Sequence, residues 1–281
     1  MEVKKVAVVT GGNKGIGFAI VKGLCEKFNG NVYLTARSIT NGNNAVIKLK
    51  QLGLNPIFHQ LDVCDENSIN TFRDYIKYTE GGVDVLINNA GIYADKLEIP
   101  IGDQAEKTIN ENYYSILNVC NALFPILRSN AQVINLSSSA GHLARIPSIN
   151  MQAKFRDPLL TVDKLSRCMN EYVEDCKNNR YIEKGWGSSP YVVSKVGVSA
   201  LSILQQNELD KETEKRNIFV NFVHPGYVDT DMTNHQGVMT IEEGAQSSIY
   251  LALGNHGLRG QYVWFNCKVV DWYGPTTPPK A

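Results

Sequence analysis

Tyr191 and Lys195 stand four positions apart in a long segment of helical apolar periodicity, residues 190–209. Residues four apart lie on one face of a helix, so this spacing brings a phenol and an ammonium group together. A free tyrosine has a pKa of about 10, which makes it a poor acid–base group at neutral pH. A neighbouring positive charge favours the phenolate and lowers that pKa. The spacing therefore predicts an acid–base pair, although ordinary packing on a helix surface produces the same spacing.

A glycine-rich stretch, TGGNKGIG (10–17), lies between an apolar run and a segment of helical periodicity. Gly11, Gly15 and Gly17 allow a sharp turn and let the backbone approach a pyrophosphate without a Cβ atom in the way. The N-terminus of the following helix offers free N–H groups and a partial positive charge to phosphates. This combination predicts a dinucleotide-binding loop.

Two cations near this loop indicate which dinucleotide binds. Enzymes that use NAD usually carry an acidic residue at the end of the second strand, where it binds the ribose hydroxyls. Here no Asp or Glu occurs from 29 through 47, and Arg37 stands at the end of LTAR (34–37). Lys14 and Arg37 could together hold the 2′-phosphate of NADP. The alternative is that both are solvated surface cations, as Lys and Arg usually are.

Polar residues also stand at the ends of two further strand-like runs. Asp62 could accept a hydrogen bond from an adenine amino group, or it could cap the helix that begins near Asp65. In NNAG (88–91) the Asn side chains could tie neighbouring strand ends together, and Ala-Gly leaves room for a cofactor. Pure turn chemistry is the alternative for NNAG.

The elements that must position these residues alternate along the chain. Apolar β-rich runs and helix-like segments predict an α/β fold, with a doubly wound, parallel, seven-stranded Rossmann-type sheet and helices on both faces. Such sheets bind ligands outside the carboxyl ends of their strands. The expected strands are 4–10, 31–37, 56–63, 83–91, 131–141, 218–226 and 260–266, and the expected helices are 16–28, 44–53, 66–79, about 103–127, 161–177 and 190–209.

One stretch interrupts the alternation. Residues 141–187 are far longer than the usual connection of about 4–6 residues, and they contain an expected helix of their own. We expect an inserted helical subdomain there, near the binding edge, within a single domain that spans 1–281. The proline-rich end, 274–281, is expected to be a loose tail.

Composition excludes several classes of function. Lys+Arg and Asp+Glu both number 28, so the chain lacks the basic footprint of a nucleic-acid-binding protein. Six scattered cysteines without a Cys-x-x-Cys pair predict free thiols and no metal site. No run approaches the roughly 20 apolar residues of a membrane span, and the first residues lack the apolar stretch of a signal peptide. A cytoplasmic protein without nucleic-acid or membrane partners is expected.

Taken together, these motifs resemble the short-chain dehydrogenase/reductase family, and within it the monomeric NADPH-dependent carbonyl reductases. The resemblance implies an enzyme with NADPH as cofactor that reduces the carbonyl group of aldehydes, ketones or quinones with the pro-S hydride. It extends to about residue 264 and rests on TGGNKGIG (10–17), LTAR (34–37), FHQLDV (58–63), DVLINNAG (84–91), INLSS (134–138), EKGWGSSPYVVSK (183–195) and HPGYVDTDM (224–232).

The resemblance implies four catalytic roles. Tyr191 would donate a proton to the carbonyl oxygen, and Ser138 would hydrogen-bond the same oxygen. Lys195 would lower the pKa of Tyr191 and hold the nicotinamide ribose. Asn112 would complete a proton relay to solvent through Lys195.

It also implies the contacts with the two small molecules. Thr230 would form a hydrogen bond with the nicotinamide carboxamide. Tyr227 would line the substrate pocket, and Ser138 and Tyr191 would be the other substrate contacts. The implied cofactor contacts are Gly11, Asn13, Lys14, Gly15, Ile16, Gly17, Arg37, Asp62, Val63, Asn89, Ala90, Gly91, Tyr191, Lys195, Pro225, Gly226, Val228 and Thr230.

Several alternatives stay open at this point. Ser137 and Ser139 are rivals of Ser138. His224 stands where human-type carbonyl reductases have a cysteine linked to glutathione binding, and it is either a packed residue or a catalytic one. Tyr93 and His142 either line the pocket or belong to ordinary loop packing.

Two alternatives concern the function itself. The enzyme could be narrow for one endogenous ketone, such as a steroid, prostaglandin or pteridine, or the chain could be a silent NADPH-binding sensor. In the carbonyl-reductase group the insertion covers the surface through which other family members associate, which implies a monomer here.

Overall fold

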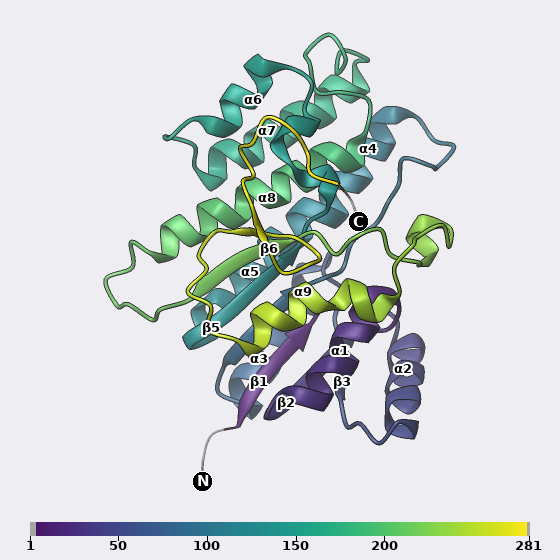
Figure 1. The fold of residues 1–281 in the computed structure, drawn as a ribbon, viewed down its shortest axis with the longest axis vertical. Helices are drawn as coiled ribbons and strands as arrows, with labels where there is room; N and C mark the ends of the chain where they lie inside the picture. Colours follow the sequence, from purple (N-terminus) through teal and green to yellow (C-terminus); the bar gives the residue numbers. More distant parts are fainter. Residues whose placement is uncertain (1–3, 280–281) are drawn as a thin grey trace.

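The computed structural model describes residues 4–279, so residues 1–3 and the last two residues of the expected tail lie outside it. The described residues form one eight-stranded sheet in the order β3-β2-β1-β4-β5-β6-β7-β8 (Figure 1). The first seven strands are parallel, as the sequence predicts. The strands are β1 (Lys5–Val9), β2 (Gly30–Ala36), β3 (Ile57–Gln60), β4 (Val83–Asn88), β5 (Leu127–Leu136), β6 (Phe219–Val223), β7 (Tyr262–Val263) and β8 (Val269–Val270).

The eighth strand corrects the expected count of seven. β8 is antiparallel to β7 and pairs with it over two residues. A tight turn makes this possible, since the backbone N–H of Trp264 donates to the carbonyl of Lys268 at 2.8 Å and Cys267 adopts a φ of +62°. The sequence offers no Gly-based hairpin signal at this turn.

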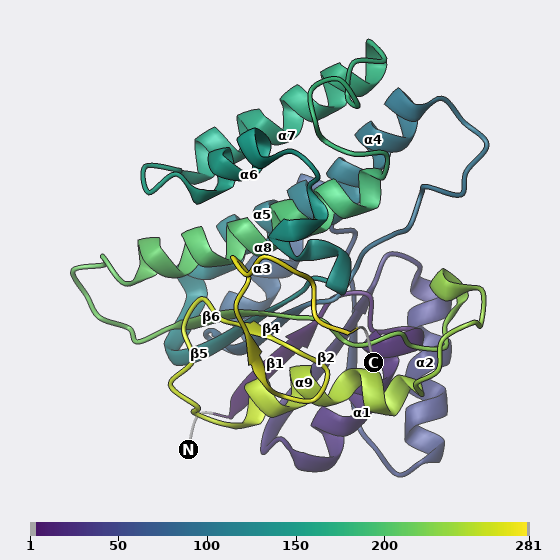
Figure 2. The same ribbon diagram turned by 45° about the horizontal axis from the view of Figure 1, so that its top comes forward.

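Helices cover both faces of the sheet (Figures 1 and 2). Along β1, Val6 and Val8 belong to one buried cluster and Ala7 and Val9 to the other, because successive side chains point to opposite faces. One cluster joins the sheet to α1, α2 and α9, and the other joins it to α3, α5 and α8. The helices are α1 (Gly15–Lys27), α2 (Ile39–Gln51), α3 (Glu66–Thr79), α4 (Ile101–Ile109), α5 (Ser115–Leu123), α6 (Ile149–Arg156), α7 (Val162–Lys177), α8 (Pro190–Leu209) and α9 (Ile241–Leu253).

The strand order reverses between β1 and β4, which lie side by side at the centre of the sheet. In sheets of this kind, ligands bind in the crevice outside the carboxyl ends of the strands at such a reversal. The glycine-rich loop follows β1, and NNAG follows β4. The topology therefore brings two of the predicted motifs to the same crevice.

Two helical expectations are wrong in detail. The single helix expected over 103–127 is divided into α4, a π-helical turn at Asn110–Tyr114, α5 and a short 3-10 turn at Phe124–Ile126. Pro125 lies in this 3-10 turn, and because it has no backbone N–H it cannot continue the hydrogen-bond pattern of α5. α9 was not predicted, although Thr240 and Glu243 form a reciprocal capping box at its start that is visible in the sequence.

The insertion forms a third layer outside the sheet and its helices (Figure 2). α6 and α7 lie over α4 and α8, and α7 packs against both of these helices. Leu165 and Met169 of α7 are fully buried, and burial of such a side chain contributes roughly 1.5–3 kcal/mol. Trp186, also fully buried, donates from Nε1 to Asp175 at 3.0 Å and anchors the end of the insertion.

The C-terminal segment returns to the sheet edge. The indole Nε1 of Trp264 donates to the carbonyl of Pro279 at 2.9 Å, so the described part of the expected loose tail makes a specific contact. Within residues 4–279, no helix is long and apolar enough to cross a membrane.

Candidate active site

The start of α8 places the tyrosine–lysine pair. Ser189 caps the helix by accepting from the backbone N–H of Val192 at 3.2 Å, and Pro190 supplies the fixed φ of a first helical residue. Tyr191 and Lys195 then lie on one face, with the lysine Nζ 5.7 Å from the centroid of the phenol ring. The structure thus brings the predicted pair together.

Lys195 reaches down to the end of the sheet. Its Nζ donates to the carbonyl of Leu136, the last residue of β5, at 2.8 Å. The side chain is buried, and burial lowers the pKa of Lys195 to about 8. The ammonium form therefore predominates at neutral pH and is lost as the pH rises through about 8.

On balance the pKa of Tyr191 is raised in this structure, and the expected lowering by Lys195 stays a prediction. Burial raises the pKa of Tyr191 to about 12, and the charge of Asp95 acts in the same direction. The Ser138 hydroxyl interacts with the phenol and lowers the pKa, but by less than burial raises it. The phenol therefore keeps its proton at neutral pH, which is the form that a proton donor needs.

The three consecutive serines have different surroundings. The Ser137 hydroxyl lies 2.7 Å from the Ser199 hydroxyl and is buried against α8. Ser139 is also buried. Ser138 is only partly buried, and it is the serine whose side chain interacts with Tyr191. This geometry favours Ser138 over its two neighbours.

Asn112 lies in the π-helical turn and fixes the loop after β4. Its side chain accepts from the N–H of Ile92 at 2.8 Å and donates to the Ile92 carbonyl at 3.1 Å and to Ser194 at 3.0 Å. A Cβ on Gly91 would stand 3.0 Å from the Asn112 Oδ1 and 3.7 Å from the Lys195 Nζ. Asn112 and Lys195 therefore lie on either side of a glycine, and π turns of this kind are frequent at functional sites.

His224 is a packed residue. It is 2% exposed, and its Nδ1 accepts from the N–H groups of Ser139 at 3.0 Å and Gly226 at 3.4 Å. Its ring lies edge-on to Trp264, with a centroid distance of 4.4 Å. The side chain therefore links the segments that follow β5 and β6.

His142 and Tyr93, the two residues left open between pocket and loop packing, have different surroundings. His142 is buried and its Nε2 bonds the carbonyl of Asp271 at 3.0 Å, so it belongs to the packing of the C-terminal segment. Tyr93 is half-buried, and its ring meets the Tyr191 ring edge-on at a centroid distance of 5.1 Å. Tyr93 therefore packs against Tyr191, which favours the pocket over ordinary loop packing.

One residue at the site was missed by the sequence analysis. Asp95 accepts a hydrogen bond from the backbone N–H of Tyr191 at 3.0 Å and another from the Ser189 hydroxyl. These contacts join residues more than 90 positions apart. No local spacing rule could have revealed them.

The glycine-rich loop has the geometry that its sequence predicts. Gly11 and Gly15 adopt φ values of +63° and +55°, which favour glycine. A Cβ on Gly17 would stand 2.3 Å from the carbonyl oxygen of Gly11, so no larger residue fits. The Asn89 side chain donates to the carbonyls of Thr10 and Gly11 at 2.9 and 3.1 Å, which ties the ends of β4 and β1 together.

The helix after this loop is open to an anion. α1 begins without a side-chain cap and without an acidic residue in its first turn. Side chains cap the first turns of α2, α3, α6, α7, α8 and α9, whereas α4, like α1, begins without such a cap. The first N–H groups of a helix have no partner within the helix. This uncapped start, in a glycine cradle, fits the pyrophosphate of a dinucleotide.

The two predicted phosphate-binding cations lie on the neighbouring surface. Gly12 donates to the carbonyl of Thr35 at 2.9 Å, which places the loop beside the end of β2, where Arg37 follows. The Arg37 side chain is exposed and forms no ion pair within residues 4–279. Lys14 is also exposed, and its Nζ lies 2.6 Å from Oδ2 of Asp231.

Asp62 does not cap the following helix. The cap of α3 is Asp65, whose side chain accepts from the N–H of Asn67 at 2.9 Å. Asp62 accepts from the N–H of Cys64 at 3.0 Å and lies at the end of β3, next to the end of β2. Its position thus agrees with the adenine side of the predicted site.

The segment after β6 crosses the glycine-rich loop. The Thr230 Cγ2 would lie 3.5 Å from a Cβ placed on Gly15, and Gly226 turns the chain with a φ of +93°. Tyr227 is half-buried and its carbonyl accepts from the N–H of Met239 at 3.1 Å. Pro225 and Val228 of the same segment are buried, and the other predicted contacts Asn13, Ile16, Val63 and Ala90 are partly buried.

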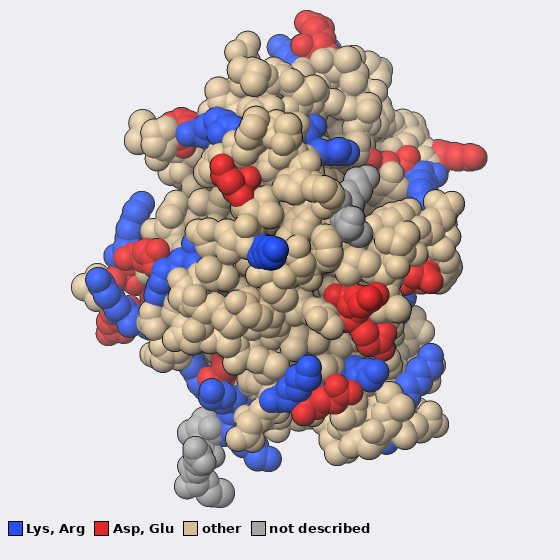
Figure 3. Space-filling view, viewed as in Figure 1, with Lys and Arg blue, Asp and Glu red and all other residues tan. Residues whose placement is uncertain are grey.

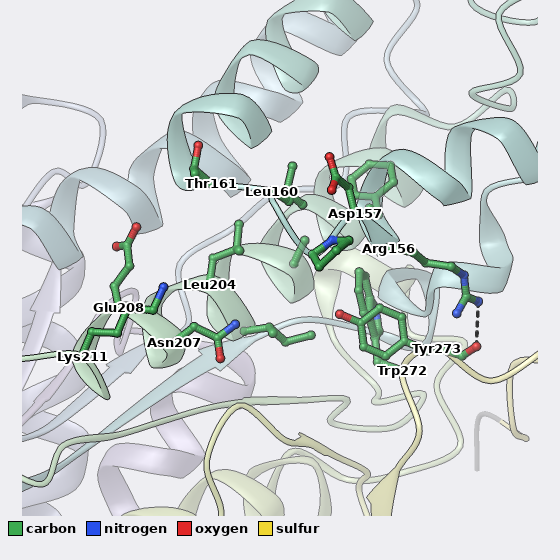
Figure 4. Close-up of a pocket in the computed structure, with 14 residues that line it drawn as sticks. Arg156, Asp157, Leu160, Thr161, Leu204, Asn207, Glu208, Lys211, Trp272 and Tyr273 are labelled. Atoms are coloured by element: carbon green, nitrogen blue, oxygen red, sulfur yellow. Dashed lines mark hydrogen bonds between the residues drawn. The ribbon is translucent and has the colours of Figure 1, made fainter.

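A cavity of about 340 Å³ lies elsewhere, between the α6–α7 connection, the C-terminal half of α8 and residues 272–273 (Figure 4). It contains none of the predicted site residues. Two of its charged groups are already bonded, since Arg156 donates to the carbonyl of Tyr273 at 2.7 Å and Asp157 accepts from Leu159 at 2.8 Å.

The comparisons with known proteins agree with this geometry. A family profile described as short chain dehydrogenase matches residues 5–151. The chain is 42% identical over 274 residues to carbonyl reductase (NADPH) 1 of Rattus norvegicus, covering 96% of this chain and 99% of the relative. It is 44% identical over 253 residues to carbonyl reductase (NADPH) 3 of Mus musculus, covering 89% and 91%.

Solved structures show the same fold. Salutaridine reductase from Papaver somniferum superposes with a TM-score of 0.84 at 31% identity, covering 94% of this chain and 100% of that one. Menthone neomenthol reductase from Mentha piperita gives a TM-score of 0.80 at 26% identity, with coverages of 93% and 99%. With the profile and the relatives, these matches show that the chain belongs to the short-chain dehydrogenase/reductase family.

Proposed function

We propose that this protein is an NADPH-dependent reductase of carbonyl compounds, acting on aldehydes, ketones or quinones, with Tyr191 as the proton donor. The observation that carries this proposal is a partly buried phenol that interacts with Ser138 and lies beside Lys195, together with a glycine-rich loop that precedes an uncapped helix. The relatives named carbonyl reductase (NADPH), at 42% and 44% identity, support the same reaction class.

The residues of the chain divide the work of the reaction. The hydride for the carbonyl carbon is supplied by the bound cofactor. Tyr191, protonated at neutral pH, donates its proton to the carbonyl oxygen, and the Ser138 hydroxyl orients that oxygen by a hydrogen bond. Lys195 holds the nicotinamide ribose and supplies positive charge near the phenol. Asn112 connects Lys195 to solvent and fixes the loop that borders the site.

The cofactor would lie along the carboxyl edge of the sheet. The pyrophosphate fits the start of α1, where Gly11, Gly15 and Gly17 let the backbone approach it. Arg37 and Lys14 would take the 2′-phosphate, and this requires Lys14 to exchange Asp231 for the phosphate.

The remaining contacts extend the site to either side. Asp62 and Val63 would contact the adenine, and Thr230 the nicotinamide carboxamide, with Asn13, Ile16, Asn89, Ala90, Gly91, Pro225, Gly226 and Val228 completing the cofactor contacts. Tyr227 would wall the substrate pocket opposite Tyr191. The pro-S hydride is the one transferred in this arrangement.

The proposed state of the protein is a cytoplasmic monomer with one domain. α7 supports the monomer, because it packs over α4 and α8 and buries Leu165 and Met169 against them. On the face seen in Figure 3, Lys and Arg side chains are interspersed with Asp and Glu, in keeping with the balanced charge of the chain. The absence of nucleic-acid and membrane partners stays a prediction.

The test of the reaction class is NADPH oxidation with menadione, a quinone, with NADH measured in parallel. We expect turnover with a strong preference for NADPH. Turnover with equal use of NADH would remove Lys14 and Arg37 as phosphate ligands. NADPH binding without turnover of any of a set of aldehydes, ketones and quinones would contradict the proposal and favour a silent sensor.

A further inference from the structure

A carboxylate is bound to the start of the helix that carries Tyr191. Asp95 accepts from the backbone N–H of Tyr191 at 3.0 Å through Oδ1, and from the Ser189 hydroxyl through Oδ2. The N–H of a residue in the first helical turn has no partner within the helix. Asp95 supplies that partner, and its negative charge complements the positive end of the α8 dipole.

The loop that carries Asp95 is itself held at both ends. Asn112 bonds the N–H and the carbonyl of Ile92, three residues before Asp95. Between these two anchors, the ring of Tyr93 meets the ring of Tyr191 edge-on, with a distance of 5.1 Å between the ring centroids. The loop after β4 therefore contacts Tyr191 at two points, the ring and the backbone N–H.

We propose that Asp95 is a positioning residue, which fixes the first turn of α8 and thereby holds the Tyr191 side chain in place. This inference rests on the proposed role of Tyr191 as proton donor. Asp95 is half-buried, and its carboxylate accepts hydrogen bonds from Ser189 and Tyr191 at the start of α8. It reaches the reaction only through Tyr191.

The charges that face the phenol provide a way to detect the contact between Asp95 and Tyr191. The groups around Tyr191 that can carry charge are Asp95 and Tyr93 from the loop, Lys195 from α8 and Tyr262 from β7. Asp95 is the one carboxyl group among them, and burial raises its own pKa above the usual value. A nearby negative charge disfavours the phenolate, so the Asp95 carboxylate raises the pKa of Tyr191, as burial does.

The test is an ultraviolet titration of the Tyr191 phenolate. The chain has 13 tyrosines, so the signal of Tyr191 is taken as the difference between each protein and the same protein with Tyr191→Phe. Asp95→Asn removes the charge and keeps the shape, and it should move the Tyr191 titration to lower pH by roughly one unit. In the dependence of kcat on pH, the alkaline limb that reports the ionisation of Tyr191 should shift to lower pH by the same amount. The limb near the pKa of Lys195 should not shift.

Glu98→Gln is the matched control. Glu98 is exposed in the same loop, and its replacement by Gln removes one negative charge as Asp95→Asn does. Tyr191 should titrate at the same pH in Glu98→Gln as in the wild type. Asp95→Ala loses both acceptor oxygens and should lower kcat about ten-fold at pH 7 with NADPH affinity unchanged. Asp95→Asn, which retains one acceptor, should recover part of that loss.

An unshifted Tyr191 titration in Asp95→Asn, or an equal shift in Glu98→Gln, would overturn the inference. The titration needs no turnover, so it is independent of the proposed function. If Tyr191→Phe still reduced carbonyl compounds at the wild-type rate, the proposed function would fail, whatever the titration of Asp95→Asn showed.

Discussion

Lys14 and Asp231 stand 217 positions apart in the chain and form an ion pair with an Nζ–Oδ2 distance of 2.6 Å. The pair joins the glycine-rich loop to the segment after β6, the two walls of the proposed cofactor site. The charge of Lys14 lowers the pKa of Asp231, so the carboxylate stays ionised under ordinary conditions. If Lys14 binds the 2′-phosphate as proposed, Asp231 competes with that phosphate for Lys14.

This competition predicts that Asp231→Asn binds NADPH more tightly than the wild type. The gain should be about two- to five-fold, the range of an exposed ion pair, and it should shrink at high salt because exposed charges are screened. Titration of intrinsic fluorescence with NADPH measures it. Asp229→Asn, which changes a nearby carboxylate that bonds His235 instead of Lys14, is the control. An unchanged NADPH affinity in Asp231→Asn would show that Lys14 does not hold the phosphate.

The second prediction concerns Arg37 and the choice of cofactor. Arg37→Asp places a negative charge where the 2′-phosphate is expected, so NADPH binding should weaken at least 100-fold while NADH binding changes little. The comparison of kcat/KM for the two cofactors checks this, with Lys48→Asp on an exposed position of α2 as a control for added charge. Equal losses for NADPH and NADH would mean that Arg37 has only a structural role.

The third prediction follows from the buried ammonium of Lys195. Its pKa falls from 10.5 to about 8 on folding, so between these values the unfolded chain binds the proton and the folded protein does not. The free energy of unfolding should therefore rise with pH in this window, by about 3 kcal/mol at most. Urea unfolding at pH 7.5 and 10, taken as the difference from Lys195→Met, measures the effect. A difference that is independent of pH would contradict the lowered pKa.

The fourth prediction concerns the insertion. Removal of α6 and α7 through deletion of 149–177, with a short glycine linker, uncovers the apolar surfaces of α4 and α8 that α7 buries. The shortened protein should self-associate, which sedimentation velocity detects. A shortened protein that stays monomeric and folded would show that the insertion does not protect this surface.

Much of the fold follows from local sequence signals. The bounds of α8 agree with the expected 190–209, because a Ser-Pro start and a continuous apolar pattern mark the helix. The seven parallel strands follow from their apolar runs. β8 and the π turn at Asn110–Tyr114 could not be predicted, since two-residue pairing and a widened helical turn leave no periodic signal.

The sequence predicted which residues form much of the candidate site better than it predicted their pKa values. Motif spacing identified Tyr191 and Lys195, whereas Asp95 depends on a contact across 96 positions that only the folded chain creates. The sign of the Tyr191 pKa shift was also beyond sequence reasoning, because burial is its largest cause and the spacing of two residues on a helix does not show how far either is buried.

The central claim is that Tyr191 donates the proton, and Tyr191→Phe tests it most directly. The variant removes one oxygen atom and leaves the ring, so the fold and the NADPH site should be intact. Turnover of menadione should fall by at least 1,000-fold, with the NADPH dissociation constant within about two-fold of the wild type. Turnover near the wild-type rate, with NADPH bound normally, would contradict the account.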